Sequence, residues 1–514
     1  MISRRNALKT LGLGSMALPS LAKAKPAKRP NIIFILADDM GWSDLGCYGS
    51  EISTPNLDRL AKGGVRFTQM HNTAKCFPSR ACLLTGLYAQ QCGMDRRPSE
   101  ITNAVTLGEV LKSAGYRTLM AGKHHGTENP FERGFDRYFG LRDGCCNYFN
   151  PGKQRPGEGK PAKKRDARAW CIDEKTYKPY TPQEEDFYTT DDFTNHAISY
   201  LDEYKNEENP FFLYLAYTAP HDPLMAWPED IAKYEDTYKV GYEAIRNARF
   251  ERQKQMGLID DSFPLSQSTY PAWDTLTEEE KKTEARKMAV YAAMIDRMDQ
   301  NIGRVLDKVK ELGEEENTLI FFASDNGCSA EVVRGGKNVP GTGEIGSMTR
   351  WSSLGPKWAN VSNVPFRLYK NYSHEGGICT PMIAHWPNGI QGKNRVTSQP
   401  GHFIDIMPTL VEVSGAEYPK KFNGETITPY EGESLTSVFQ GREFERQKPI
   451  FWQWARGKAV RTDRWKYVSW SGSTELYDMR VDKTETNNLA KKKPQVLEKL
   501  LNLYEDWWKH CGKK

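Results

Sequence analysis

The sequence lacks three features that would assign it to a simple class. Its weakly apolar N-terminal run is too short and too rich in Gly and Ser to cross a bilayer, and no other stretch is long and apolar enough. Its ten cysteines form no paired C-x-x-C spacing of the kind that binds structural zinc. No internal repeat recurs along its 514 residues. The sequence therefore predicts no transmembrane segment, zinc-ribbon site or repeat array.

Neither sign of charge dominates. The chain carries 71 basic and 66 acidic residues, a net charge of +5, which argues against nucleic acid as a partner. A hydrophobic fraction of 38% in a chain of this length is enough for one large and one smaller core, so two domains are expected. The chain is too long for a small disulfide scaffold. We expect most of the cysteines to be buried free thiols, with room for one or two disulfides after export.

Residues 1–24 have the pattern of a targeting segment. The run from Ser3 to Lys9 contains a twin-arginine pattern, with Ala7 where a bulkier apolar residue is usual. A weakly apolar run follows to about Leu21, and Ala22-Lys23-Ala24 supplies small residues for a cleavage site. An amphipathic first helix is the alternative. We interpret the segment as a twin-arginine-type signal peptide, which predicts export of the folded protein by the twin-arginine machinery of a bacterium, to the periplasm or beyond.

Continuous apolar runs alternate with helical patterns over most of the chain. Runs typical of strands buried on both faces are Asn31–Ala37, Thr118–Ala121, Phe211–Tyr217, Leu319–Ala323 and Met382–His385. Helices are indicated by a capping box at Thr106–Glu109, by an amphipathic pattern over Glu284–Leu312, and by a second pattern over Asp405–Val413 that Gly415 ends. This alternation predicts an α/β fold with a mostly parallel central sheet flanked by helices.

The pattern changes after about Gly441. Short aromatic-rich runs suit strands at Ile450–Trp454, Ala459–Arg461 and Trp465–Trp470, and a last helix is expected over Pro494–Trp508. We therefore predict a large α/β domain over residues 25–440 and a small α+β domain over residues 441–514. Within the large domain, the basic segment Lys153–Arg168 reads as a loop. Either it is simply solvated or it holds a polyanionic substrate.

Polar residues follow two of the predicted strands. Asp38 and Asp39 come directly after the first strand, and Asp325 and Asn326 follow the strand that ends near Ser324. Ligands of open parallel sheets bind beyond the carboxyl ends of the strands, so these side chains are expected to converge. An all-oxygen set of this kind suits Ca²⁺ or Mg²⁺. Taken alone, an Asp-Asp pair after a strand more often serves a turn or a helix cap, but two such pairs at two strand ends favour a metal.

The most informative stretch runs from Cys76 to Gly86 and reads Cys-Phe-Pro-Ser-Arg-Ala-Cys-Leu-Leu-Thr-Gly. Pro78 suits the first turn of a helix, which would put residue 76 at a helix N-terminus, where an anion is favoured. The stretch resembles the signature C-x-P-S-R-x-x-L-L-T-G of the formylglycine-dependent (type I, arylsulfatase-like) sulfatases. These belong to the alkaline-phosphatase-like superfamily. The resemblance implies that a formylglycine-generating or sulfatase-maturating enzyme oxidises Cys76 to formylglycine (3-oxoalanine).

The resemblance covers roughly residues 30 to 490. It implies one Ca²⁺ per subunit, with ligands at Asp38, Asp39, Cys76, Asp325 and Asn326. It also implies catalytic roles for Cys76, Arg80, Lys123, His125, His221 and Lys370. Lys123 and His125 come from a stretch like G-K-W-H in which His124 replaces the aromatic residue, His221 from one like A-P-H-x-P, and Lys370 from one like K-x-x-x-x-E-G-G.

The activity that the resemblance implies is hydrolysis of sulfate monoesters by a formylglycine gem-diol nucleophile and Ca²⁺. His221 is implied as the proton donor to the leaving oxygen, with Lys370 assisting, and His125 as the residue that serves the second hydroxyl. For an exported enzyme a sulfated carbohydrate is the expected substrate, and an aryl sulfate can serve in assays. The alternatives are a phosphate or phosphonate ester hydrolase of the same superfamily and a non-catalytic binder of sulfated glycans.

Overall fold

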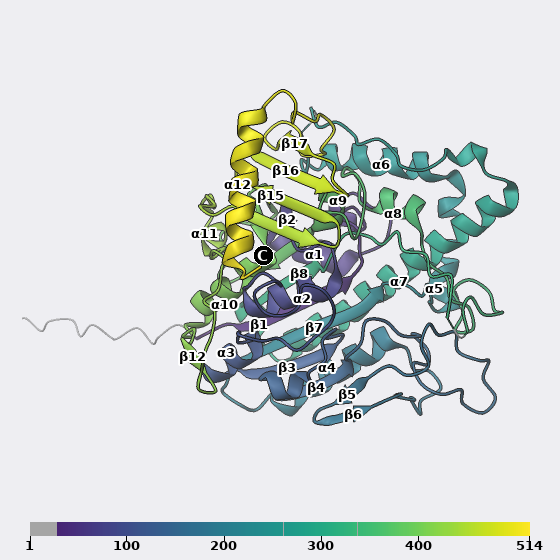
Figure 1. The fold of residues 1–514 in the computed structure, drawn as a ribbon. Coiled ribbons are helices and arrows are strands. Elements are labelled where there is room, and N and C mark those ends of the chain that lie inside the picture. Colours follow the sequence, from purple (N-terminus) through teal and green to yellow (C-terminus); the bar gives the residue numbers. More distant parts are fainter. Residues whose placement is uncertain (1–27, 261, 337, 514) are drawn as a thin grey trace, which may run out of the picture.

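The computed structural model describes residues 28–260, 262–336 and 338–513 (Figure 1). The predicted signal peptide, residues 1–24, lies outside the described residues and stays a prediction. Within the described part of the chain, no helix combines the length and the apolar character needed to cross a bilayer. All ten cysteines are free thiols.

A large mixed sheet forms the centre of the protein, and its middle is parallel. Strand β1 (Asn31–Asp38) pairs in parallel with β7 (Phe211–Pro220) on one side and β8 (Thr318–Ser324) on the other. Strand β3 (Arg117–Gly122) pairs in parallel with β7, and β4 (Arg137–Leu141) with β3. The prediction of a mostly parallel central sheet is confirmed.

The flanks of the sheet contain antiparallel pairs. Strand β9 (Cys379–His385) runs antiparallel to both β8 and β2 (Val65–His71). The sequence did not predict β2, because polar residues interrupt its apolar ones although the whole strand is buried. On one side of the sheet, β10 (Arg395–Thr397) and β11 (Gly401–His402) both pair in parallel with β2. On the other side, β5 (Trp170–Ile172) pairs antiparallel with β4, and β6 (Lys175–Tyr177) pairs antiparallel with β5.

Helices cover both faces of the sheet because β1 buries side chains on both. Ile33 and Ile35 belong to the core cluster shared with α4 (Thr189–Glu203) and α7 (Glu278–Glu311). The opposite face of β1 packs with α2 (Cys76–Thr85), α3 (Leu107–Ser113) and α10 (Ile406–Ser414). The other α-helices that precede the C-terminal sheet are α1 (Pro55–Gly63), α5 (Pro228–Ala232), α6 (Tyr242–Gln255), α8 (Pro356–Ser362), α9 (Glu375–Ile378) and α11 (Thr436–Phe439).

The predicted helix ends are largely confirmed. The capping box forms as expected, with Thr106 Oγ1 accepting a hydrogen bond of 3.2 Å from the Glu109 amide. Gly415 ends α10 in the left-handed conformation. The long helix α7 begins at Glu278, six residues before the prediction, and Thr277 caps it. Its first turn is charged and carries no apolar stripe, so hydrophobic periodicity could not detect it.

The C-terminal part contains an antiparallel sheet of β14 (Ile450–Trp454), β15 (Gly457–Arg461), β16 (Trp465–Trp470) and β17 (Glu475–Asp478). Helix α12 (Pro494–His510) lies across this sheet (Figure 1). A short hairpin, β12 (Lys421–Phe422) and β13 (Glu425–Thr426), precedes it. The α+β character of this part is confirmed, and β17 was not predicted. The domain boundary at residues 440 and 441 stays a prediction.

A buried ionic network joins the C-terminal sheet to the central sheet. Lys466 Nζ on β16 lies 2.7 Å from Glu375 Oε1 and 2.7 Å from Glu485 Oε1. Glu375 Oε2 lies 2.9 Å from His71 Nε2 on β2. Glu375 begins α9, five residues after Lys370, so the network holds the segment that carries Lys370.

Candidate active site

The predicted site residues meet at the carboxyl edge of the central sheet. Asp38 ends β1 and Asp39 follows it in the left-handed conformation (φ +65°). Lys123 follows β3, His221 follows β7, and Asp325 with Asn326 follows β8. Because β1 lies between β7 and β8, these loops open at one place. The convergence expected from the sequence is present.

The acidic residues form one buried cluster. Ligand atoms of Asp38, Asp39 and His221 lie within 4.8 Å of one another, as do those of Asp38, Cys76 and Asp325. Asn326 Nδ2 donates to Asp39 Oδ1 at 2.7 Å. Its own Oδ1 and Asp38 Oδ1 are buried and have no hydrogen-bond partner among the described residues. Unpartnered buried oxygens in an oxygen-rich set fit a hard divalent cation.

Three buried cations face this cluster. Lys123 Nζ contacts Asp38 Oδ2, Arg80 Nε donates to Asp325 Oδ2 at 2.8 Å, and Lys370 Nζ donates to Asp39 Oδ2 at 2.7 Å. Burial opposes ionisation of Asp38, but Lys123 and its neighbours hold the pKa of that carboxyl well below its usual range. Burial, reinforced by the Asp38 charge, raises the pKa of Asp325 to about 6. The two carboxyls therefore compete for the same positive charge.

Cys76 is the first residue of α2 and is buried beside the acidic cluster. The helix begins here because Lys75 is extended and Pro78 favours the first turn. Ser79 Oγ donates to the Lys75 carbonyl oxygen at 2.8 Å, which fixes the turn. Burial raises the pKa of the Cys76 thiol, against the opposing influence of Lys123 and Lys370. The predicted position of residue 76 at a helix N-terminus is found.

The two predicted histidines differ in their surroundings. His125 has a left-handed backbone (φ +68°), and its ring meets that of Phe77 edge-on at 5.7 Å. Burial, together with the charges of Lys123 and Arg80, lowers the pKa of His125 far below its usual value, so the ring is neutral near pH 7. His221 Nδ1 lies 2.6 Å from the backbone oxygen of Asp222, and its Nε2 lies 3.4 Å from Asp39 Oδ2.

A cavity of about 330 Å³ opens onto these groups, and Cys76, His125, His221 and Lys370 all line it. Sequence reasoning missed Glu331, which also lines it. Glu331 Oε1 lies 2.5 Å from Lys75 Nζ, and Glu331 Oε2 lies 3.7 Å from Lys370 Nζ. Glu331 stands in no predicted motif, so nothing in the sequence pointed to it.

The family model described as Sulfatase matches residues 30–416, the part of the chain that contains every residue of this site. The chain belongs to the sulfatase family. It is a sulfuric ester hydrolase. A second family model, described as N-sulphoglucosamine sulphohydrolase, C-terminal, matches residues 366–507 of this sulfatase.

Related proteins resemble this sulfatase over most of its length. An arylsulfatase of Klebsiella aerogenes is 34% identical over 469 residues, which cover 85% of this chain and 97% of the relative. An uncharacterized sulfatase of Schizosaccharomyces pombe is 34% identical, with 94% of each chain covered. A crystal structure of Ps i-CgsB in complex with k-i-k-neocarrahexaose matches with a TM-score of 0.67 and 26% identity, covering 93% of each chain.

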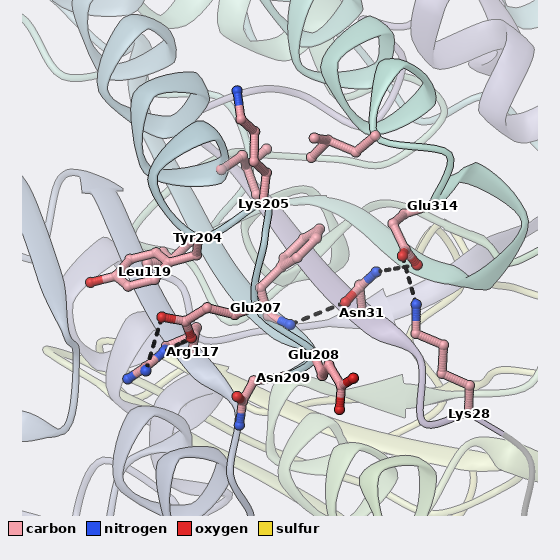
Figure 2. Close-up of a pocket in the computed structure, with 13 residues that line it drawn as sticks. Lys28, Asn31, Arg117, Leu119, Tyr204, Lys205, Glu207, Glu208, Asn209 and Glu314 are labelled. Carbon is pink, nitrogen blue, oxygen red and sulfur yellow. Dashed lines mark hydrogen bonds and ion pairs between the residues drawn. The ribbon is translucent and has the colours of Figure 1, made fainter.

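The sulfatase has a second cavity, of about 390 Å³, at the opposite edge of the same sheet, where β1, β3 and β7 begin (Figure 2). Several of its polar groups pair with one another. Lys28 Nζ lies 2.6 Å from Glu314 Oε1, and Arg117 forms a bidentate pair with Glu207. Asn31 Nδ2 donates to Glu314 Oε2 at 3.0 Å. Because these charges are satisfied by each other at the surface, this cavity is the weaker candidate for catalysis.

Proposed function

We propose that this sulfatase hydrolyses sulfate monoesters of a sulfated carbohydrate, using a formylglycine at position 76 and one Ca²⁺ ion at the acidic cluster. One observation carries the proposal. The side chain of residue 76 lies at the start of α2, in a cavity that His221 and Lys370 also line. Its Sγ lies within 4.8 Å of carboxylate oxygens of Asp38 and Asp325.

The raised pKa of the Cys76 thiol argues against the unmodified cysteine as the nucleophile. A buried thiol with a raised pKa is a poor nucleophile, because the thiolate is the reactive form. Oxidation by a maturation enzyme would replace this thiol by an aldehyde. Its hydrate would supply one hydroxyl that attacks sulfur and a second that lets sulfate leave without attack of water on sulfur.

The oxygen atoms of the acidic cluster support the proposal of a bound Ca²⁺ ion. Asp38, Asp39, Asp325, Asn326 and residue 76 would hold the ion, and the unpartnered Asp38 Oδ1 and Asn326 Oδ1 are the strongest indication. When bound, Ca²⁺ would supply Lewis-acid polarisation of the sulfate oxygens and compensate the crowded carboxylates.

The protein's own charges would bind and orient the sulfate. Arg80, Lys123 and Lys370 are buried and fully cationic, because the neighbouring carboxylates outweigh the effect of burial and raise their pKa values. Preorganised charge of this kind costs no reorganisation when negative charge develops in the transition state. Each cation is held by a carboxylate of the cluster, so metal site and sulfate site form one unit.

The two histidines would divide the proton transfers. His221 Nδ1 faces a backbone oxygen that can only accept a hydrogen bond, so Nδ1 carries a proton and Nε2 is the exchanging atom. We assign His221 Nε2 as the donor to the leaving oxygen, with Lys370 assisting. His125 is neutral and can accept a proton from the second hydroxyl at position 76.

Substrate class and location are proposals as well. A solved relative is described in complex with k-i-k-neocarrahexaose and another relative as an arylsulfatase, which supports a sulfated carbohydrate as substrate and an aryl sulfate as assay compound. The twin-arginine pattern supports a periplasmic or secreted enzyme, with Cys76 oxidised before export of the folded chain.

Mass spectrometry of the peptide around Cys76, taken from active protein, tests the proposal. Formylglycine is expected, together with turnover of 4-nitrophenyl sulfate well above that of 4-nitrophenyl phosphate. Unmodified cysteine in fully active protein would refute the mechanism. Preference for the phosphate would favour a phosphate or phosphonate ester hydrolase, and binding of sulfated glycans without turnover would favour a glycan binder.

A further inference from the structure

The basic loop of residues 153–168 reaches the catalytic cavity. Lys164, Arg165 and Arg168 line the same cavity as Cys76 and His221. The loop contains no helix or strand, as the sequence predicted. Its basic residues therefore stand beside the nucleophile position rather than on a remote surface.

The loop is held against the body of the protein. Asn147 is buried, and its Nδ2 donates both to the Ala162 carbonyl oxygen at 3.0 Å and to that of Met348 at 2.8 Å. The Ala162 amide also donates to the Met348 oxygen at 3.0 Å. At the C-terminal end of the loop, the Ala169 amide donates to Asp143 Oδ2 at 2.6 Å. These buried bonds fix the backbone on both sides of the cationic residues.

Within the part of the chain that the structure describes, the three loop cations lack acidic partners. Among the described residues, no carboxylate lies within ion-pair distance (4.0 Å) of Lys164, Arg165 or Arg168. Arg168 Nη2 instead lies 3.3 Å from Cys145 Sγ, and burial raises the pKa of that thiol, so the partner is neutral. By contrast, Lys75, which lines the same cavity, is paired with Glu331. The loop side of the cavity thus carries positive charge that no ion pair with a described carboxylate neutralises, although Asp143 and Asp222 also line the cavity.

A neutral group that lines the same cavity also lacks a hydrogen-bond partner among the described residues. Trp351 lines the cavity and is 4% exposed, and its Nε1–H has no hydrogen-bond acceptor among the described residues. An unused N–H donor at the border of the cavity suits a ligand that carries oxygen acceptors. Charge and hydrogen-bonding capacity thus point to the same kind of ligand.

We propose that Lys164, Arg165 and Arg168 form a second anion subsite beside the scissile sulfate, so that the substrate is a glycan with at least two anionic groups. This inference rests on the proposed function and narrows it. The second group is a sulfate ester or a carboxylate, since both are recognised by the same cations.

Inhibition of 4-nitrophenyl sulfate hydrolysis tests the subsite. The probes are a dextran sulfate oligosaccharide, tetragalacturonate and neutral maltotetraose. The variants are Lys164→Gln with Arg165→Gln, both at exposed positions, and Arg168→Gln separately. Lys160→Gln is the matched control, because Lys160 is exposed on the same loop but does not line the cavity. Thermal unfolding of every variant checks that the fold is intact.

In the double variant, the Ki of at least one anionic probe is expected to increase by a factor at least ten times larger than the factor by which the KM for 4-nitrophenyl sulfate increases. The Ki of that probe should also depend less on salt concentration than it does in the wild type. The probe that is affected more identifies the second group as sulfate or carboxylate. Ki values like those of Lys160→Gln, or equal inhibition by maltotetraose, would overturn the subsite. If the wild type hydrolyses neither 4-nitrophenyl sulfate nor the dextran sulfate oligosaccharide, the proposed function fails, and calorimetric binding of the same probes still decides the subsite.

Discussion

The two edges of the central sheet, where the same strands begin and end, differ in how their charged side chains are buried and paired. At the carboxyl edge, Asp38, Asp325 and Arg80 are buried together, and two non-glycine residues nearby adopt left-handed backbones. At the amino edge, Lys28–Glu314 and Arg117–Glu207 pair in contact with solvent. Buried, crowded charge and backbone strain persist only where the surrounding structure enforces them, and such places are typically functional. Paired surface charge needs no such support.

The largest expected effect is on catalysis at the carboxyl edge. Cys76→Ala should lower kcat/KM for 4-nitrophenyl sulfate by about 10³-fold or more, because the nucleophile is removed. Cys82→Ala, on the same helix and buried in the apolar core, is the control that should keep its activity. Enzyme kinetics and thermal unfolding measure both. A Cys76→Ala protein with more than a few per cent of wild-type activity would contradict the assignment.

The next effect is on stability at the same edge. Asp325→Asn keeps the shape of the side chain but leaves Arg80 without its carboxylate at 2.8 Å. Removing one partner of a buried ion pair costs about 3–5 kcal/mol of unfolding free energy, and Asp38 remains 3.8 Å from Arg80 Nη2. Urea unfolding measures this loss, and isothermal titration with Ca²⁺ should show weakened metal binding. A loss below about 1 kcal/mol, as at a surface pair, would place this cluster in the same class as the amino edge.

Removal of the metal is expected to act on the carboxyl edge alone. With Ca²⁺ at 100 times its Kd, binding stabilises the folded protein by about 2.7 kcal/mol, which EDTA should abolish. Thermal unfolding with Ca²⁺ and with EDTA gives the shift in Tm. Asp325→Asn should show a smaller shift than wild type. Identical melting curves of wild type in both solutions would remove the calcium proposal.

The smallest effect is expected at the amino edge. Glu207→Gln breaks the pair with Arg117, which is partly exposed, so the unfolding free energy should change by less than about 1 kcal/mol. Its activity on 4-nitrophenyl sulfate should equal that of wild type. Urea unfolding and steady-state kinetics provide the measurement. A loss of unfolding free energy as large as that of Asp325→Asn would show that the ion pairs of the two edges do not differ in their contribution to stability.

Much of the fold could be predicted because its signals are local. Apolar runs located β1, β3, β7 and β8, and a capping box located the start of α3. Strand β2 was not predicted, because it contains polar residues although it is buried throughout. The antiparallel direction of β9 was not predicted either, because an apolar run indicates that a strand is buried but not in which direction it runs.

The sequence alone determined which chemical groups stand at the strand ends and which residue begins α2, because strand periodicity, turn residues and the first helical turn depend on near neighbours. Only the tertiary structure decided which of those ends are adjacent. The order β8, β1, β7, β3 is not the order of the chain, and it brings Asp38 to Asp325 and Lys123. It likewise decided that Glu331 meets Lys370 and that the loop of residues 153–168 faces Cys76. Such contacts arise from strand pairing and loop docking over long separations, which no local pattern encodes.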